Sequence, residues 1–132
     1  MDLEIINIAS NTDNNKNIKN RTHHAKLKNS ICGDEIKIDL IIKDDKIVDF
    51  GYEGKSCVYC QASASLLSKV SINRSKIEIN ELCNDASSYF LDDLKSLKKK
   101  WKSLEKLFKR KNKSREGCIL LPFKTMKKII SE

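Results

Sequence analysis

The chain has 132 residues, a net charge of +8, five cysteines, four glycines and one proline. It is long enough to fold as one domain around its own core. It contains no apolar run of 18 residues, and no basic segment followed by an apolar one at its start, so neither a membrane span nor a signal peptide is expected. We therefore expect a cytoplasmic protein, whose cysteines serve metal, sulfur or redox chemistry and not disulfides.

The positive charge is concentrated in one segment. Residues 95–115 contain eleven Lys or Arg and a single acidic residue, Glu105, so this segment alone carries +10 and the rest of the chain −2. The basic character therefore belongs to one element and its exit, and not to the part of the chain that contains most of the cysteines.

Residues 1–30 are rich in Asn and show no sustained helical or strand period. They predict a loosely ordered N-terminal arm, with a short ordered piece around residues 3–8. His23 and His24 lie in this arm, and an adjacent pair of His in a polar arm is usually solvated, so we expect neither to bind a metal. Residues 31–132 are expected to form the folded domain.

A β-hairpin is expected after this arm. Residues 35–43 and 46–53 both alternate apolar with polar side chains, and the two Asp between them suit a tight turn. Because paired antiparallel strands begin and end together, Cys32 before the first strand and Cys57 after the second arrive at the same end of the hairpin.

The pattern changes to that of a helix over residues 58–70, with Ser56 as its expected cap. Cys57 then lies at or just before a helix N-terminus, where free backbone N–H groups and the helix dipole favour a thiolate. Cys60 lies one turn further along the same helix.

The next residues predict a turn and a short helix near residues 79–83, in which Cys83 is a small buried hydrophobe. Residues 86–110 then predict the longest helix, of about six turns. Its apolar stripe is expected to pack in the core, which is favoured over a docking helix for an acidic partner, a membrane surface or nucleic acid. The stripe consists of Phe90, Leu94, Leu97, Trp101, Leu104 and Phe108.

A final helix is expected over residues 119–130, with Pro122 in its first turn and Cys118 at its N-terminus. Together these elements predict an α+β fold: a small antiparallel sheet of about three strands with helices packed on one face.

Three cysteines at the ends of three elements, together with one aspartate, predict a four-ligand metal site. A set of three thiolates and one carboxylate suits zinc or an iron–sulfur cluster. The carboxylate is a harder and more exchangeable ligand than a fourth thiolate, which suits a site that releases what it binds. The expected ligands are Cys32, Asp34, Cys57 and Cys118.

Two motifs that flank the hairpin resemble those of the NifU/IscU/SufU family of iron–sulfur cluster assembly proteins. They are Ser-Ile-Cys-Gly-Asp and Tyr-Glu-Gly-Lys-Ser-Cys-x-x-x-x-Ala-Ser-Ala-Ser, and a lone late cysteine precedes a C-terminal helix. The resemblance covers residues 30–130 and implies a SufE/NifU-like fold. It implies that the same four residues bind a nascent cluster or zinc, and that a SufS-like cysteine desulfurase and apo iron–sulfur proteins or other SUF components are the partners. The long interval between Cys57 and Cys118 is similar to that of the SufU-type branch.

The chain departs from the family pattern in four places. Gly117 stands where IscU-type members have His and SufU-type members a basic residue, and the Leu-Pro-Pro-Val-Lys chaperone site is missing. The N-terminal arm has no Asn-Pro motif. Cys60 is an additional thiol within the second motif, able either to replace a ligand or to act as a resolving or sulfur-receiving partner.

Two mechanisms follow from the resemblance. A scaffold would receive sulfur from the desulfurase, bind iron and build a transient cluster for apo-proteins. A SufU-type sulfurtransferase would instead hold zinc at the same ligands and accept persulfide on Cys118, and Cys118 is the expected mobile thiol under either mechanism. A basic nucleic-acid-binding module with a structural zinc is a third, less favoured interpretation, because the charge lies on one element and no zinc-finger spacing is present.

Overall fold

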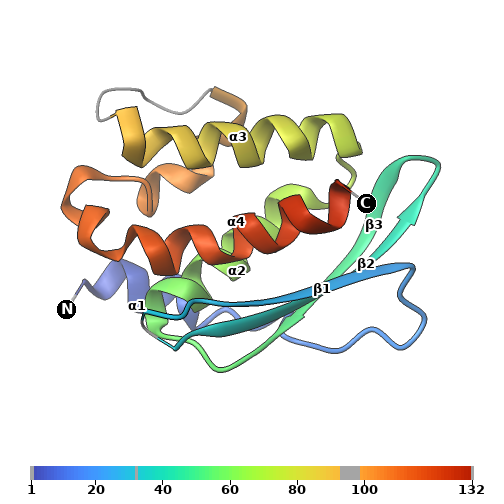
Figure 1. The fold of residues 1–132 in the computed structure, drawn as a ribbon, viewed down its shortest axis with the longest axis horizontal. Coiled ribbons are helices and arrows are strands. Elements are labelled where there is room, and N and C mark those ends of the chain that lie inside the picture. The colour runs from blue at the N-terminus through green and yellow to red at the C-terminus, as the bar shows by residue number, and fades with distance from the viewer. Residues whose placement is uncertain (1, 32, 93–98, 132) are drawn as a thin grey trace.

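The computed structural model describes residues 2–31, 33–92 and 99–131. These residues form a three-stranded antiparallel sheet, in the order β1-β2-β3, with helices on one of its faces (Figure 1). The predicted α+β fold is thereby confirmed. The elements are α1 (Leu3–Ala9), β1 (His23–Lys28), β2 (Glu35–Lys43), β3 (Lys46–Glu53), α2 (Val58–Ser71), α3 (Lys76–Asp92), the 3₁₀ segments η1 (Lys99–Lys106) and η2 (Arg110–Arg115), and α4 (Glu116–Ile130).

The hairpin of β2 and β3 has the predicted bounds. Asp44 and Asp45 both have positive φ angles, 51° and 65°, as the tight turns that match the twist of paired strands require. The register shifts between Ile41 and Ile42. Near the turn Ile47 is therefore buried and Val48 is exposed, whereas strict alternation from Phe50 would have buried Val48.

The expectation of a loosely ordered arm over residues 1–30 is wrong, although its short ordered piece is confirmed as α1. Asp39, buried in β2, accepts a hydrogen bond from the Ile18 N–H at 3.1 Å and forms an ion pair with Arg21 at 3.6 Å. The Tyr52 N–H donates to the Asn14 carbonyl at 3.0 Å. The partners in these contacts are distant from the arm in sequence, so the composition of the arm does not indicate that it is ordered.

The helices form two layers over the sheet. α4 contacts β1 and β2 and α2 contacts β3, while α3 packs on the outer side of α4 (Figure 1). Apolar side chains from the sheet and from all four α-helices form one continuous core. Among the described residues, no helix is both long and apolar enough to cross a membrane.

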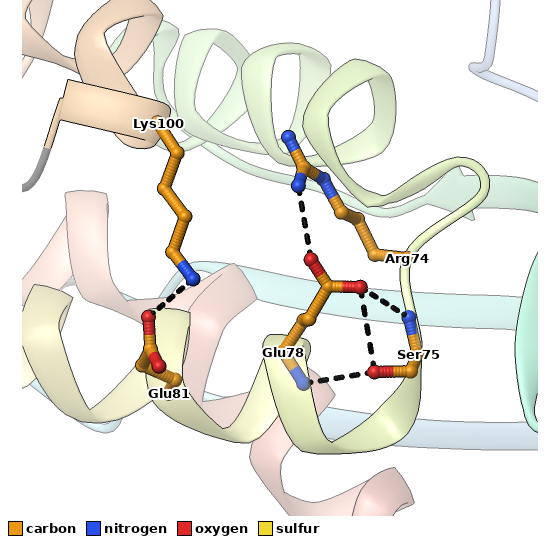
Figure 2. A network of polar contacts seen from close by, with 5 residues as sticks. All are labelled: Arg74, Ser75, Glu78, Glu81 and Lys100. Atoms are coloured by element: carbon orange, nitrogen blue, oxygen red, sulfur yellow. Dashed lines mark hydrogen bonds and ion pairs between the residues drawn. The ribbon is translucent and has the colours of Figure 1, made fainter.

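α3 begins earlier than the sequence analysis expects. The Ser75 hydroxyl accepts a hydrogen bond from the Glu78 N–H at 3.2 Å, and the Glu78 carboxylate accepts one from the Ser75 N–H at 3.2 Å (Figure 2). This reciprocal pair is a capping box, which satisfies backbone donors at a helix start. The Ser-x-x-Glu spacing was the signal for one continuous helix instead of a turn and a short helix.

The expected six-turn helix over residues 86–110 is also wrong. α3 is described as far as Asp92, and residues 93–98, with Leu94 and Leu97, lie outside the described part. Trp101 has non-helical angles of φ −105° and ψ 20°. Trp101, Leu104 and Leu107 are all fully buried, and a spacing of three residues places side chains on one face of a 3₁₀ helix. The prediction that the stripe packs in the core is confirmed for its described residues. The prediction that they share one α-helix is wrong, because residues 99–106 form a 3₁₀ segment.

The last helix begins before its predicted start. Because α4 begins at Glu116, Cys118 is in its first turn and Pro122 is in its second, not its first. Pro122 has no N–H to donate to the carbonyl of Cys118, four residues earlier. The helix therefore lacks one regular backbone hydrogen bond next to this cysteine.

Candidate metal centre

Asp34 is positioned by a turn that Asn29 closes. The Asn29 N–H donates to the Asp34 carbonyl at 2.7 Å, and the Gly33 N–H donates to the Asn29 carbonyl at 2.8 Å. Gly33 has a φ of +78°, a backbone conformation that residues other than glycine rarely adopt. Gly33 thus forms part of a tight turn that places Asp34, which is 7% exposed, directly before β2.

Cys57 reaches the same place from the other end of the hairpin. The Glu35 N–H donates to the Lys55 carbonyl at 2.8 Å, which ties the exit of β3 to the start of β2. Cys57, and not the expected Ser56, is the N-cap residue of α2. Its N–H donates to Asp34 Oδ1 at 3.1 Å, so the two motifs are joined directly.

The glycine of the second motif permits this close approach. A Cβ on Gly54 would lie 2.1 Å from the Glu35 carbonyl oxygen, and its φ of +156° is unusual for other residues. We expect Gly54→Ala to lower the unfolding free energy by about 2 kcal/mol or more, since the backbone itself must move. Thermal unfolding measures this loss. A melting temperature equal to that of the exposed control Glu53→Ala would contradict it.

Cys118 is brought to the hairpin end by the packing of α4 on α2. The Ser63 hydroxyl of α2 donates to the Ile119 carbonyl at 2.5 Å, which fixes the start of α4 against the first turns of α2. Cys118 itself is 7% exposed. The predicted convergence of element ends is therefore observed for Cys118 as well as for Cys57.

Asp34, Cys57 and Cys118 form a candidate metal-binding group. One ligand atom from each of the three residues lies within 4.8 Å of the other two. Asp34 Oδ2 is buried and has no hydrogen-bond partner among the described residues, whereas Oδ1 accepts the Cys57 N–H. An unpartnered carboxylate oxygen beside two thiols is costly unless it faces a cation, so the donor set fits a thiolate-binding metal. Cys32, the fourth predicted ligand, lies outside the described residues.

A cavity of about 590 Å³ opens beside Cys118. Its lining includes basic side chains from both sides of this residue, Lys113 and Lys124, together with exposed Leu91. It combines apolar and cationic surface next to a thiol, a combination that suits the approach of an anionic or acidic partner.

The missing side chain at position 117 has a local explanation. A Cβ on Gly117 would lie 2.9 Å from Asn29 Nδ2. The Asn29 amide therefore occupies the space next to Cys118 that a larger side chain would need. The same Asn29 closes the turn of Asp34, so this departure from the family pattern and the geometry of the first motif are linked.

Among the described residues, Cys60, Cys83 and the two histidines lie outside this group. Cys83 is buried, and burial raises the pKa of its thiol to about 12. This agrees with the prediction that it is a small hydrophobe. Cys60 is fully buried in α2, and neither His23 nor His24 belongs to a metal-binding group among the described residues.

Three basic side chains from the described part of the basic segment form ion pairs with the protein itself. Lys100 forms an ion pair with Glu81 at 2.6 Å (Figure 2). Lys109 pairs with an acidic residue in the first turn of α1, and Lys111 pairs with the N-cap residue of that helix. Trp101 is fully buried, with the Arg74 guanidinium 5.1 Å from its ring centroid. A buried ring cannot stack on bases, so the segment does not present the surface of a single-strand binder.

The fold and these three converging donors define a small α+β domain with a candidate metal site, rich in cysteine, at one end of a hairpin. The family model for the NifU-like N-terminal domain matches residues 3–106. The chain belongs to this family, as its motifs predict.

Relatives and solved structures agree with this assignment. The chain is 33% identical over 106 residues to the iron–sulfur cluster assembly scaffold protein IscU of Thermotoga maritima, covering 80% of this chain and 74% of that one. It superposes with a TM-score of 0.88 on FiSufU from Fervidobacterium islandicum AW-1, described as a scaffold for the SUF system, at 26% identity and with 98% and 96% of the two chains covered. A NifU-like protein from Brucella abortus has the same fold, with a TM-score of 0.88, 20% identity and 98% and 91% coverage.

Proposed function

We propose that this protein is an iron–sulfur cluster assembly scaffold. It receives sulfur from a cysteine desulfurase, binds iron, holds the nascent cluster as its cargo on Cys32, Asp34, Cys57 and Cys118, and passes the cluster to apo-proteins. Family membership and the names of the relatives support this role.

The observation that carries the proposal is the meeting of Asp34, Cys57 and Cys118. These residues come from a turn, a helix cap and the first turn of a distant helix, yet their ligand atoms lie within 4.8 Å of one another. A mixed thiolate and carboxylate set holds iron less firmly than four thiolates, which favours release to an acceptor.

The same donors also suit zinc, and zinc at this site is the second candidate. It would make the protein a sulfurtransferase that accepts persulfide on Cys118, which lies beside the cavity and is therefore within reach of a donor. Metal analysis separates the two functions, because a transfer protein retains stoichiometric zinc and forms no visible chromophore.

Partners and compartment follow from the chemistry. A SufS-like desulfurase is the proposed sulfur donor, and its approach to Cys118 would use the cavity with Lys113 and Lys124. Thiols that must remain reduced require a reducing compartment, which supports a cytoplasmic location.

The test is anaerobic reconstitution with ferrous iron, cysteine and a desulfurase. We expect a visible chromophore that transfers to an apo-ferredoxin and that fails to form in Cys57→Ala, because that variant lacks a central ligand. Cys83→Ala is the matched control, since this thiol is buried away from the site and should leave the chromophore unchanged. Stoichiometric zinc without a chromophore would favour the sulfurtransferase. If the protein held no metal and formed no chromophore, both proposed functions would be overturned.

A further inference from the structure

Cys57 and Cys60 occupy the N-cap and third positions of α2. Cys57 has extended backbone angles, φ −71° and ψ 169°, and its carbonyl accepts the N–H of Gln61 at 3.0 Å, as the residue that caps a helix does. N-cap and third-position side chains reach each other in a capping box. Helix geometry puts their Cα atoms roughly 5 to 6 Å apart, within the span of about 4.4 to 6.8 Å that a disulfide bridges.

Cys60 also lies on the face of α2 that the candidate metal centre shares. Ser63, one turn further along, contacts the start of α4 through its bond to the Ile119 carbonyl, so this face of α2 is directed toward Cys118. The two thiols differ in access: Cys57 is partly exposed, and Cys60 is fully buried. A partly exposed first thiol with a buried second thiol is the arrangement of a pair in which one cysteine meets external groups and the other reacts only within the molecule.

We propose that Cys57 and Cys60 form a redox-active dithiol that reduces incoming sulfane sulfur to sulfide. The proposal rests on the scaffold function above. A desulfurase delivers sulfur at the oxidation state of a persulfide, whereas a cluster contains sulfide, so each sulfur atom requires two electrons. The dithiol supplies these electrons at the site where the sulfide is used.

The reaction balances in three steps. The outer sulfur of a Cys118 persulfide is transferred to the Cys57 thiol, whose ligand atom lies within 4.8 Å, and this regenerates the Cys118 thiol. The Cys60 thiol then attacks the inner sulfur of the Cys57 persulfide. The Cys57–Cys60 disulfide forms, the sulfur–sulfur bond of the persulfide breaks, and hydrogen sulfide leaves with the proton. A dithiol reductant of the thioredoxin class reduces the disulfide through partly exposed Cys57, which restores Cys57 as a ligand.

The test uses metal-free protein loaded with sodium tetrasulfide, which persulfidates thiols without a desulfurase. After excess reagent is removed, we expect wild-type protein to release sulfide and to acquire a Cys57–Cys60 disulfide, detected by peptide mass mapping without reductant. Cys60→Ala should retain its persulfide and release sulfide about tenfold more slowly or worse, since an intramolecular thiol acts at a high effective concentration. Cys83→Ala, which removes another buried thiol, should behave as wild type.

The wild-type mapping needs no variant and remains decisive if Cys60→Ala folds poorly. Sulfide release without a Cys57–Cys60 disulfide, or release from folded Cys60→Ala at the wild-type rate, would overturn the dithiol. Because this assay contains neither iron nor a desulfurase, it can fail while the chromophore and its transfer to an apo-ferredoxin succeed. The two proposals are therefore separable.

Discussion

Replacing Cys118 by Ser is expected to abolish persulfide acceptance from a cysteine desulfurase while the fold is retained. The hydroxyl of Ser cannot form a sulfur–sulfur bond, and Cys118 is the thiol that lines the cavity beside the candidate metal centre. The substitution replaces sulfur by oxygen at a site that is 7% exposed, so we expect a stability change of about 1 kcal/mol or less. Incubation with desulfurase and radiolabelled cysteine, followed by gel electrophoresis without reductant, measures the protein-bound sulfur.

The matched control is Cys83→Ser. Its thiol is buried and its pKa is raised to about 12, so almost none of it is thiolate near neutral pH, and the thiolate is the nucleophile. This variant should accept sulfur as the parent does. If Cys118→Ser accepted sulfur at the parent rate, Cys57 or Cys60 would be the first acceptor, and the role given to Cys118 would be wrong.

The sequence predicted the hairpin and the meeting of its two ends because both depend on local rules. Alternating side chains define β2 and β3, and antiparallel pairing then places Asp34 and Cys57 together. The approach of Cys118 was predicted from its position at a helix start and is observed. These features required only periodicity, turn chemistry and the two motifs.

The errors concern elements that are stabilised by contacts distant in sequence. The N-terminal segment is ordered because buried Asp39 holds the Ile18 N–H, and nothing in the composition of residues 1–30 indicates that bond. In the basic segment, the stripe through Trp101 and Leu104 fits an α-helix as well as a 3₁₀ helix. Lys99, Lys102 and Lys106 repeat at spacings of three and four residues, which places like charges together in a continuous helix and disfavours it. The balance between burial of the apolar side chains and repulsion between the lysines depends on the packing of the folded protein, and periodicity alone does not predict it.

Asp34 has two separable roles in the structure. Its Oδ1 accepts the N–H of Cys57 at 3.1 Å and so holds the N-terminus of α2, while Oδ2 is buried without a hydrogen-bond partner among the described residues. The first role stabilises the apo-protein. The second is costly in the apo-protein and is compensated only when a cation binds, so a single residue links the stability of the fold to the affinity of the site.

Asp34→Asn and Asp34→Ala are expected to separate these roles. Asn keeps an acceptor for the Cys57 N–H but removes the anionic ligand, so the apo-protein should melt at or above the parent temperature while iron or zinc affinity falls. Changes in groups around ligands alone alter metal affinity about 10–100-fold, and loss of a ligand should reach at least the upper end of this range.

Ala should weaken metal binding to the same extent and also destabilise the apo-protein relative to Asn by about 1–3 kcal/mol, because the Cys57 N–H loses its acceptor. Thermal unfolding of the metal-free proteins and competition titration with a chromophoric chelator measure the two effects, with Asp44→Asn, at an exposed position in the hairpin turn, as the control for the charge change. Parent-like metal affinity in Asp34→Asn would show that the carboxylate is not a ligand. Equal melting temperatures for the Asn and Ala variants would show that the bond to Cys57 does not hold the helix.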